Sequence, residues 1–167
     1  MKKLILGIAA LGLLALVSCN KESEQSTPDE PGSCTLTGNV WAALNLSNDT
    51  TDAGEFIAGL KNEEVDGVNI TFILNSGDLD HNPDPDFDYK DLSFTTTVED
   101  GLYSISLPAI TTPLSVKVLL DDFVEDQRQF VPGDVVFETK TFSQGIIEVD
   151  GLSQGVTRVR DFTYEYE

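Results

Sequence analysis

The 167-residue sequence is poor in positive charge and in the side chains that most enzymes use for catalysis. It has ten lysines and arginines against 29 aspartates and glutamates, one histidine and two cysteines, and its formal net charge is −19. Phosphate binding needs clustered Lys and Arg, so this composition argues against nucleic acid as a partner. His81 is the one histidine, and the sequence contains neither a Gly-x-Ser-x-Gly elbow nor a His-Glu-x-x-His motif. The sequence therefore predicts a protein that is not an enzyme.

The first 18 residues have the pattern of a targeting segment. Two lysines precede an apolar run over residues 4–17, which is too short to span a bilayer comfortably. Leu16-Val17-Ser18-Cys19 resembles the lipobox of bacterial lipoproteins. The resemblance implies a lipoprotein signal peptide over residues 1–18, cleavage before Cys19, and acylation of Cys19 by fatty acids such as palmitate, which attach the protein to a membrane. The alternative is a soluble secreted protein in which Cys19 is incidental.

Residues 19–33 are predicted to form a disordered tether between the lipidated Cys19 and a folded domain over residues 34–167. No aliphatic or aromatic side chain occurs from Asn20 to Ser33, so this stretch has nothing to bury in a core. Lys21-Glu22-Ser23-Glu24 loosely resembles the acidic export tags of lipoproteins that reach the outer face of the outer membrane. The resemblance implies an outer-membrane lipid anchor with the cell surface favoured over the periplasmic face, although a plain linker can carry the same charges.

The stretch from Leu92 to Leu107 is predicted to be a β-hairpin. Asp100-Gly101 separates two strand-like runs and favours a type I′ turn, which needs a positive φ at both central residues. Folding about this turn gives three pairs on one mostly apolar face: Val98 with Tyr103, Thr96 with Ile105, and Phe94 with Leu107. An isolated hairpin is marginal in water, so this one is expected to be part of a sandwich or barrel.

Further alternating runs predict an all-β domain. Val68, Ile70, Phe72 and Leu74 alternate strictly with polar neighbours and predict a half-buried strand. Residues 47–67 lose this period and are expected to form a loop, with one or two short helical turns between Glu55 and Glu64. The other predicted strands cover residues 34–44, 114–120, 128–131, 135–142, 146–149 and 156–166, with turns at Pro132-Gly133, Gln144-Gly145 and Asp150-Gly151. This spacing indicates a β-sandwich of about seven or eight antiparallel strands.

Four short motifs occur in a fixed order: Leu36-Thr37-Gly38-Asn39-Val40, Gly67-Val68-Asn69-Ile70, the stretch 96–105 around Asp100-Gly101, and 114–118. This order resembles the carboxypeptidase regulatory-like domain, a transthyretin-like sandwich, over about two thirds of the domain. The chain departs from that pattern in a first loop stretched over residues 45–66, and at Asp122-Phe123, where the family often has Gly before an aromatic residue. The resemblance implies a module for binding or scaffolding, as in surface nutrient-uptake systems and adhesins.

The stretch 77–88 has the residue types of a site for a hard cation. An oxygen ligand stands at every second position, and Ca²⁺ takes 6 to 8 oxygens. The stretch departs from the EF-hand pattern, with Pro83 where a glycine is needed and Tyr89 where a glutamate is needed. The alternative is a solvated, self-repelling loop. The candidate Ca²⁺ ligands are Asp78, Asp80, Asn82, Asp84, Asp86 and Asp88.

Aromatic side chains give a second set of candidate binding residues. Trp41, Tyr89, Tyr164 and Tyr166 are the residues that could stack on sugar rings, although the same positions suit core or edge residues of strands. We expect a non-catalytic binding or accessory module with a glycan or protein partner, used in glycan or nutrient uptake. The alternative is an adhesin or fimbria-like subunit that assembles through edge strands.

Overall fold

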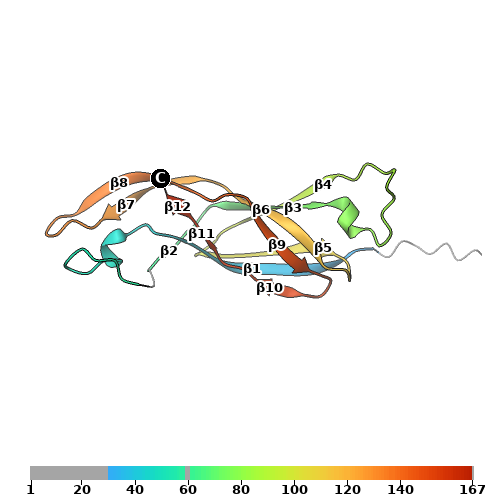
Figure 1. The fold of residues 1–167 in the computed structure, drawn as a ribbon, viewed down its shortest axis with the longest axis horizontal. Coiled ribbons are helices and arrows are strands. Elements are labelled where there is room, and N and C mark those ends of the chain that lie inside the picture. The colour runs from blue at the N-terminus through green and yellow to red at the C-terminus, as the bar shows by residue number, and fades with distance from the viewer. Residues whose placement is uncertain (1–29, 59–60, 167) are drawn as a thin grey trace, which may run out of the picture.

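The structure is a computed structural model that describes residues 30–58 and 61–166. The predicted signal peptide over residues 1–18, the lipid attachment at Cys19 and the tether up to residue 29 lie outside the described residues. The described part contains twelve β-strands and two short 3-10 helices, arranged as layers of an elongated molecule (Figure 1). The prediction of an all-β sandwich is therefore confirmed. Within the same part of the chain, no helix has the length and apolar character needed to cross a membrane.

The first sheet is organised around β1 (Gly32–Ala42). On one side, β5 (Leu102–Ala109) and β2 (Glu63–Glu64) pair antiparallel with β1. On its other side, β10 (Thr157–Val159) and β11 (Phe162–Thr163) pair with it in parallel. The first strand thus begins two residues before the expected start of the domain at residue 34, and it takes partners from both halves of the chain.

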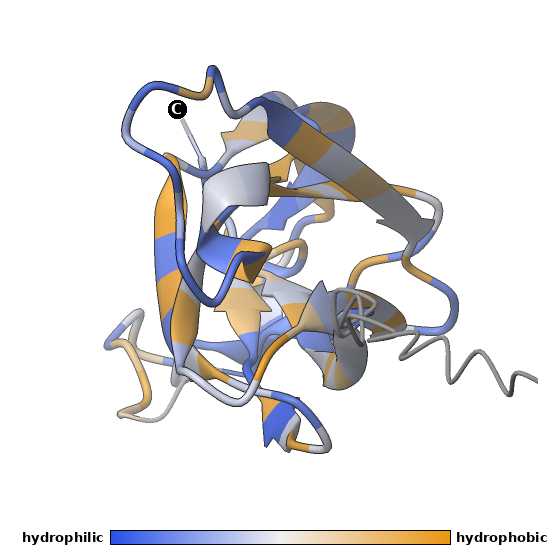
Figure 2. Ribbon diagram, turned by 90° about the vertical axis from the view of Figure 1, so that its right-hand side faces the viewer, coloured by the Kyte–Doolittle hydropathy of each residue, from blue (hydrophilic) through white to orange (hydrophobic). Residues whose placement is uncertain are grey.

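The second sheet contains four antiparallel strands in the order β4, β3, β6 and β9. Their bounds are Asp91–Thr97 for β4, Asn69–Asn75 for β3, Leu114–Leu120 for β6 and Ile147–Leu152 for β9. Hydrophobic and hydrophilic residues alternate along strands of the molecule (Figure 2), and the alternating residues of β3 are buried and partly exposed in turn. This alternation places the apolar face of each strand against the facing sheet.

A third, smaller sheet extends to one end of the molecule. The hairpin of β7 (Phe123–Gln129) and β8 (Val136–Ser143) forms most of this sheet, and β12 (Glu165–Tyr166) pairs with β8. The free edge of β7 is partly covered, because the backbone N–H of Arg128 donates to the carbonyl of Leu44 at 2.8 Å. The hairpin therefore lies beside the loop that follows β1, at the left of Figure 1.

One hydrophobic core joins the sheets. Cys34 is one of its members and is almost completely buried. Stacked aromatic rings extend the core toward β7 and β8, where the centroids of Phe123 and Phe142 are 4.9 Å apart. The largest fully buried side chains are Phe72, Phe142, Phe162, Leu36, Ile70, Leu74, Leu107 and Leu152.

The predicted hairpin is correct at its turn and wrong in its pairing. Asp100 has a φ of 49° and Gly101 a φ of 74°, as a type I′ turn requires. Beyond the Glu99–Leu102 bridge, however, β4 pairs with β3 in the second sheet and β5 pairs with β1 in the first sheet. The predicted pairs from Phe94 to Leu107 therefore do not form. The turn is a corner between the two sheets, because burying both apolar faces in one core requires the strands to separate.

Three other sequence-based expectations are corrected. No helical turn is present among the described residues of 55–64, and the 3-10 helix η1 (Leu46–Asn48) lies earlier in the loop. Asp150-Gly151 lies inside β9, where the register with β6 shifts and Gly151 has a φ of 73°; this is a bulge and not a chain reversal. Finally, the last predicted strand, over residues 156–166, is divided into β10, β11 and β12.

Candidate functional site

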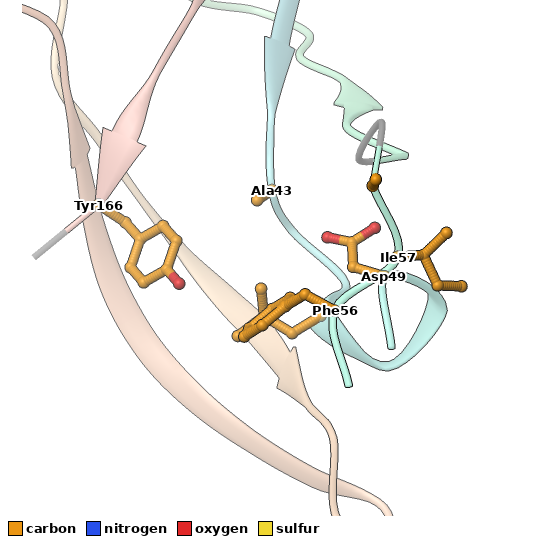
Figure 3. A pocket seen from close by; sticks show the side chains of 7 residues that line it. Ala43, Asp49, Phe56, Ile57 and Tyr166 are labelled. Carbon is orange, nitrogen blue, oxygen red and sulfur yellow. The ribbon is translucent and has the colours of Figure 1, made fainter. Parts of the chain in front are cut away.

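A pocket of about 310 Å³ lies between Tyr166 of β12 and the pocket loop, by which we mean residues 43–58. Tyr166 and Phe56 are on opposite sides of the opening (Figure 3). Small-ligand pockets typically measure roughly 300 to 1,000 Å³, so this one suits a small molecule. Its lining residues are Ala43, Leu46, Asp49, Phe56, Ile57, Ala58 and Tyr166.

Glu63 of β2 holds the first part of the pocket loop in place. Its Oε2 accepts hydrogen bonds from the backbone N–H groups of Leu44 at 2.9 Å and Asn45 at 3.2 Å. Its Oε1 accepts a hydrogen bond from the side-chain amide of Asn48 at 2.8 Å. Asn45 in turn caps η1 by accepting from the backbone N–H of Ser47 at 3.2 Å. A partly buried carboxylate with three donors fixes this turn firmly.

The second part of the pocket loop turns back on itself and presents Phe56 to solvent. The backbone N–H of Thr51 donates to the carbonyl of Glu55 at 2.8 Å, and that of Ile57 donates to the carbonyl of Asp49 at 2.6 Å. In spite of this ordered backbone, the side chain of Phe56 is 67% exposed. Its neighbour Ile57 is 39% exposed and also lines the pocket, so the two residues form an apolar pair at its edge. Contiguous apolar surface of this kind is a feature of binding sites.

Asp49 is one of the residues that line the pocket and is fully buried, and its carboxyl group lies between Ala43 and Ile57 in Figure 3. Its Oδ1 accepts a hydrogen bond from the backbone N–H of Lys61 at 3.1 Å, whereas its Oδ2 has no hydrogen-bond partner among the described residues. Burial raises the pKa of Asp49; the Lys61 N–H opposes this rise, and the negative charge of Glu63 adds to it. The pocket therefore contains a buried carboxylate oxygen, Oδ2 of Asp49, that can still accept a hydrogen bond.

The four aromatic candidates from the sequence lie in different surroundings. Tyr166 is 39% exposed and lines the pocket, as a binding residue would. Tyr164 is buried, and its hydroxyl donates to the carbonyl of Asp121 at 2.6 Å, so it is a core residue.

The other two aromatic candidates are not among the residues that line the pocket. Trp41 is partly buried in β1. Tyr89 packs edge-on against Phe87 at a centroid distance of 4.8 Å. The structure thus brings one of the four to the pocket.

The acidic loop, residues 77–88, lies at the opposite end of the molecule from the pocket and is organised around Tyr89. The Tyr89 hydroxyl donates to Oδ2 of Asp80 at 2.8 Å and accepts from the backbone N–H of Asp84 at 2.9 Å. Oδ1 of Asp80 accepts from the backbone N–H of Asn82, and Oδ1 of Asp84 accepts from that of Asp86, both at 2.9 Å. The N–H of Asn82 and the Tyr89 hydroxyl lower the pKa of Asp80.

The other two candidate ligands in the acidic loop are Asp78 and Asp88. Asp78 lies in the first turn of η2 (Ser76–Leu79), and Asp88 forms an ion pair with Lys90. Across residues 30–58 and 61–166, no group of three or more His, Cys, Asp or Glu side chains is arranged to hold a metal ion. The six oxygen ligands are therefore not brought together as a coordination sphere, and Ca²⁺ binding there remains a prediction from the sequence.

Sequence reasoning did not identify Asp49, Phe56 and Ile57 as site residues. They lie in the stretch 47–67, where the alternation that identifies strands is absent. One signal was available, because Phe56-Ile57 is an apolar pair that follows ten mostly polar residues. The burial of Asp49 was not predictable, since it depends on contacts with residues 12 and more positions away.

Comparison with known proteins gives little that bears on function. No protein-family model matches the chain, and no curated protein matches it. Among solved structures, the chain is similar to a crystal structure from Pseudomonas aeruginosa described as a "putative carbohydrate binding protein", with 11% sequence identity and a TM-score of 0.39. The match covers 82% of this chain and 92% of that one. A likeness at this level does not support an argument about what the pocket binds.

Proposed function

We propose that the protein is a non-catalytic binding module that is anchored in the outer membrane through a lipid on Cys19 and faces the cell surface. In this proposal, the pocket between Phe56 and Tyr166 holds a small ligand from the medium, such as a glycan fragment or another nutrient. The lipobox-like Leu16-Val17-Ser18-Cys19 supports the anchor. The resemblance to the carboxypeptidase regulatory-like domain, which is carried by the turn at Asp100-Gly101 and the strands beside it, supports a binding role.

The observation that carries the proposal is the exposure of Phe56 over a pocket that also contains Tyr166 and a buried carboxylate. Exposing an aromatic ring costs hydrophobic free energy, and the hydrogen bonds of the pocket loop keep the ring in that position. An apolar wall with one or two convergent polar groups is the usual composition of a small-molecule site.

The position of the pocket fits a surface-anchored protein. Strand β1 begins at Gly32 at one end of the molecule, and the pocket loop follows it at the other end (Figure 1). An anchor that precedes β1 would therefore leave the pocket on the side of the domain that points away from the membrane.

Binding is tested with the mature acylated protein in detergent micelles, applied to arrays of glycans and small metabolites. We expect a ligand that is retained by the wild-type protein and lost by Phe56→Ala and Tyr166→Ala. Phe87→Ala is the matched control, since Phe87 is similarly exposed, at 62%, but belongs to the acidic loop, which lies at the other end of the molecule. Retention of the same ligand by Phe56→Ala and Tyr166→Ala would show that the pocket is not the site.

The location is tested separately from binding. Mass spectrometry of the mature amino terminus should find a fatty-acylated Cys19, and protease added to intact cells should degrade the domain. An unmodified amino terminus would contradict the anchor. Full protection from protease, with degradation after the outer membrane is opened, would contradict the surface position.

A second candidate function is a fimbria-like or adhesin subunit that assembles through edge strands. Among the described residues, β4 pairs with β3 alone and β5 with β1 alone, and a cleft of about 610 Å³ lies between them, lined by Thr96, Thr97, Ser104 and neighbouring residues. Unpaired strand edges beside a cleft can accept an extended segment from another chain. Sedimentation analysis distinguishes the functions, because concentration-dependent assembly supports the subunit and a monomer at all concentrations supports the binding module.

A further inference from the structure

One carboxylate oxygen at the pocket lacks a hydrogen-bond partner among the described residues. Asp49 is fully buried, yet its carboxylate accepts one hydrogen bond, from a backbone N–H, and its Oδ2 is without a partner among the described residues. Burying an ionised carboxylate without a compensating partner is costly. A protein keeps such a group where it serves a function, so the missing partner is expected to come from a ligand.

One negatively charged side chain, Glu63, and one positively charged side chain, Lys61, act on the buried carboxylate of Asp49. Glu63 lies close enough to raise the pKa of Asp49, and its own two oxygens are taken up by the backbone of residues 44–45 and by Asn48. Lys61 is exposed and contributes its backbone N–H to Asp49, and its positive charge lowers the pKa of Asp49. Asp49 and Glu63 carry two negative charges against this one positive charge. The ion pairs found in the described residues are Lys90 with Asp88 and Lys140 with Glu138, and neither includes Asp49. The pocket therefore has a local excess of negative charge.

We propose that the pocket binds an organic cation, in which an ammonium group on an apolar ring or chain is held by the Asp49 carboxylate between Phe56 and Tyr166. This inference rests on the proposed binding function and names the ligand class for the same pocket. The ammonium supplies the charge that the buried carboxylate lacks, and the low dielectric of the pocket wall strengthens this attraction. The faces of aromatic rings attract cations as well. The net charge of −19 draws cations toward the protein from solution.

A neutral hydroxyl ligand fits these observations less well. A hydroxyl can donate one hydrogen bond to Oδ2, but it does not offset the excess of negative charge that Asp49 and Glu63 have over Lys61. An ammonium provides both the donor and the compensating charge. The comparison between the two ligand types is therefore a direct test of the inference.

The test uses benzylammonium and benzyl alcohol, which have the same ring and differ in the charged group. Binding of each to the mature acylated protein is followed by calorimetry and by NMR signals of the Phe56 and Tyr166 rings. We expect benzylammonium to bind at least tenfold more tightly than benzyl alcohol. Asp49→Asn should abolish this difference, because the amide is isosteric but cannot be charged. Asp52→Asn, which removes one exposed charge from the same loop, should preserve the difference.

The outcomes separate the two proposals. Equal binding of the two probes, with the same affinities in Asp49→Asn, overturns the cation inference and leaves the pocket as a binding site for neutral ligands. An equal loss of the preference in Asp49→Asn and Asp52→Asn also overturns it, because the effect would then be one of net charge. If neither probe shifts the ring signals of Phe56 or Tyr166, while an array ligand still binds elsewhere on the protein, both this inference and the assignment of the pocket are wrong.

Discussion

The hydroxyl of Tyr103 donates a hydrogen bond of 2.7 Å to the backbone carbonyl of Arg160, which lies 57 residues further along the chain. Tyr103 is buried in β5, and its ring stacks on that of Phe162 at a centroid distance of 5.3 Å. Burial raises the pKa of Tyr103 well above its usual range, so its hydroxyl remains protonated and continues to donate at neutral and moderately alkaline pH. This contact fixes the segment between β10 and β11 to the first sheet.

Tyr103→Phe is expected to destabilise the protein by about 1 to 2 kcal/mol, because it keeps the ring and leaves the carbonyl of Arg160 without its donor. Urea unfolding measures the change. Tyr166→Phe is the control, since Tyr166 is partly exposed and its substitution should change the free energy of unfolding by less than about 0.5 kcal/mol. Equal effects of the two substitutions would contradict the role of the Tyr103 hydrogen bond.

Gly101→Ala is expected to destabilise the corner between the sheets by about 1 to 3 kcal/mol. Gly101 has a φ of 74°, and an added Cβ would lie 2.6 Å from Cβ of Glu64, so backbone strain and a clash act together. Gly133→Ala separates the two effects, because Gly133 has a φ of 79° with nothing within 4 Å of the added atom. Thermal unfolding should show a smaller decrease in melting temperature for Gly133→Ala than for Gly101→Ala. A larger decrease for Gly133→Ala would exclude the clash with Glu64.

Asp49→Asn should stabilise the protein at neutral pH while abolishing the preference for the charged probe. The raised pKa of Asp49 means that the folded state binds its proton more tightly than the unfolded state does, so the contribution of Asp49 to stability is greatest at low pH. That contribution falls as the pH rises from the usual Asp pKa through the raised one. Asparagine does not titrate, so its contribution to stability does not fall with rising pH. The free energy of unfolding of the variant should therefore exceed that of the wild type by on the order of 1 kcal/mol at pH 7.

Urea unfolding of the wild type and Asp49→Asn at several pH values between 4 and 7 measures this gain. The charged groups beside Asp49 are Lys61 and Glu63, and they are the same in both proteins. Asp52→Asn should follow the wild type across the same range. A constant difference between Asp49→Asn and the wild type at all pH values would contradict the linkage to Asp49.

Calcium at millimolar concentration should leave the melting temperature of the protein unchanged. Both carboxylate oxygens of Asp80 and one of Asp84 already accept hydrogen bonds within the acidic loop, and binding an ion would require these to break. A ligand specific for the folded state raises the melting temperature. A rise with Ca²⁺ that is reversed by a chelator would therefore show that the acidic loop rearranges into a binding site.

The sequence was most informative where the alternation of side chains was strict. It predicted β3, β6 and the inward faces of β4 and β5, because a period of two follows directly from the pleat of a strand. It also predicted the type I′ turn at Asp100-Gly101, which depends on local backbone geometry. Local rules could not predict that the two strands enter different sheets, since that depends on the partners that β1 and β3 provide.

The pocket was less predictable than the sheets. Phe56 and Asp49 are positioned by hydrogen bonds within an aperiodic loop, including those that the Glu63 carboxylate accepts from the first part of the pocket loop. These contacts follow from the arrangement of several turns, and no single residue pattern encodes them. Tyr166 was recognised as a candidate by residue type alone, and its place in the pocket depends on the pairing of β12 with β8.

The parallel pairing of β1 with β10 and β11 affects how the domain assembles. Asn39 in β1 donates its backbone N–H to Asp161 across 122 residues, so the first strand acquires its last neighbours only after nearly the whole domain has been made. Contacts of such high sequence separation slow folding, because a long loop must close before they form. We therefore expect refolding on a timescale of about milliseconds to seconds, with β1 remaining open along one edge until the carboxyl-terminal strands arrive.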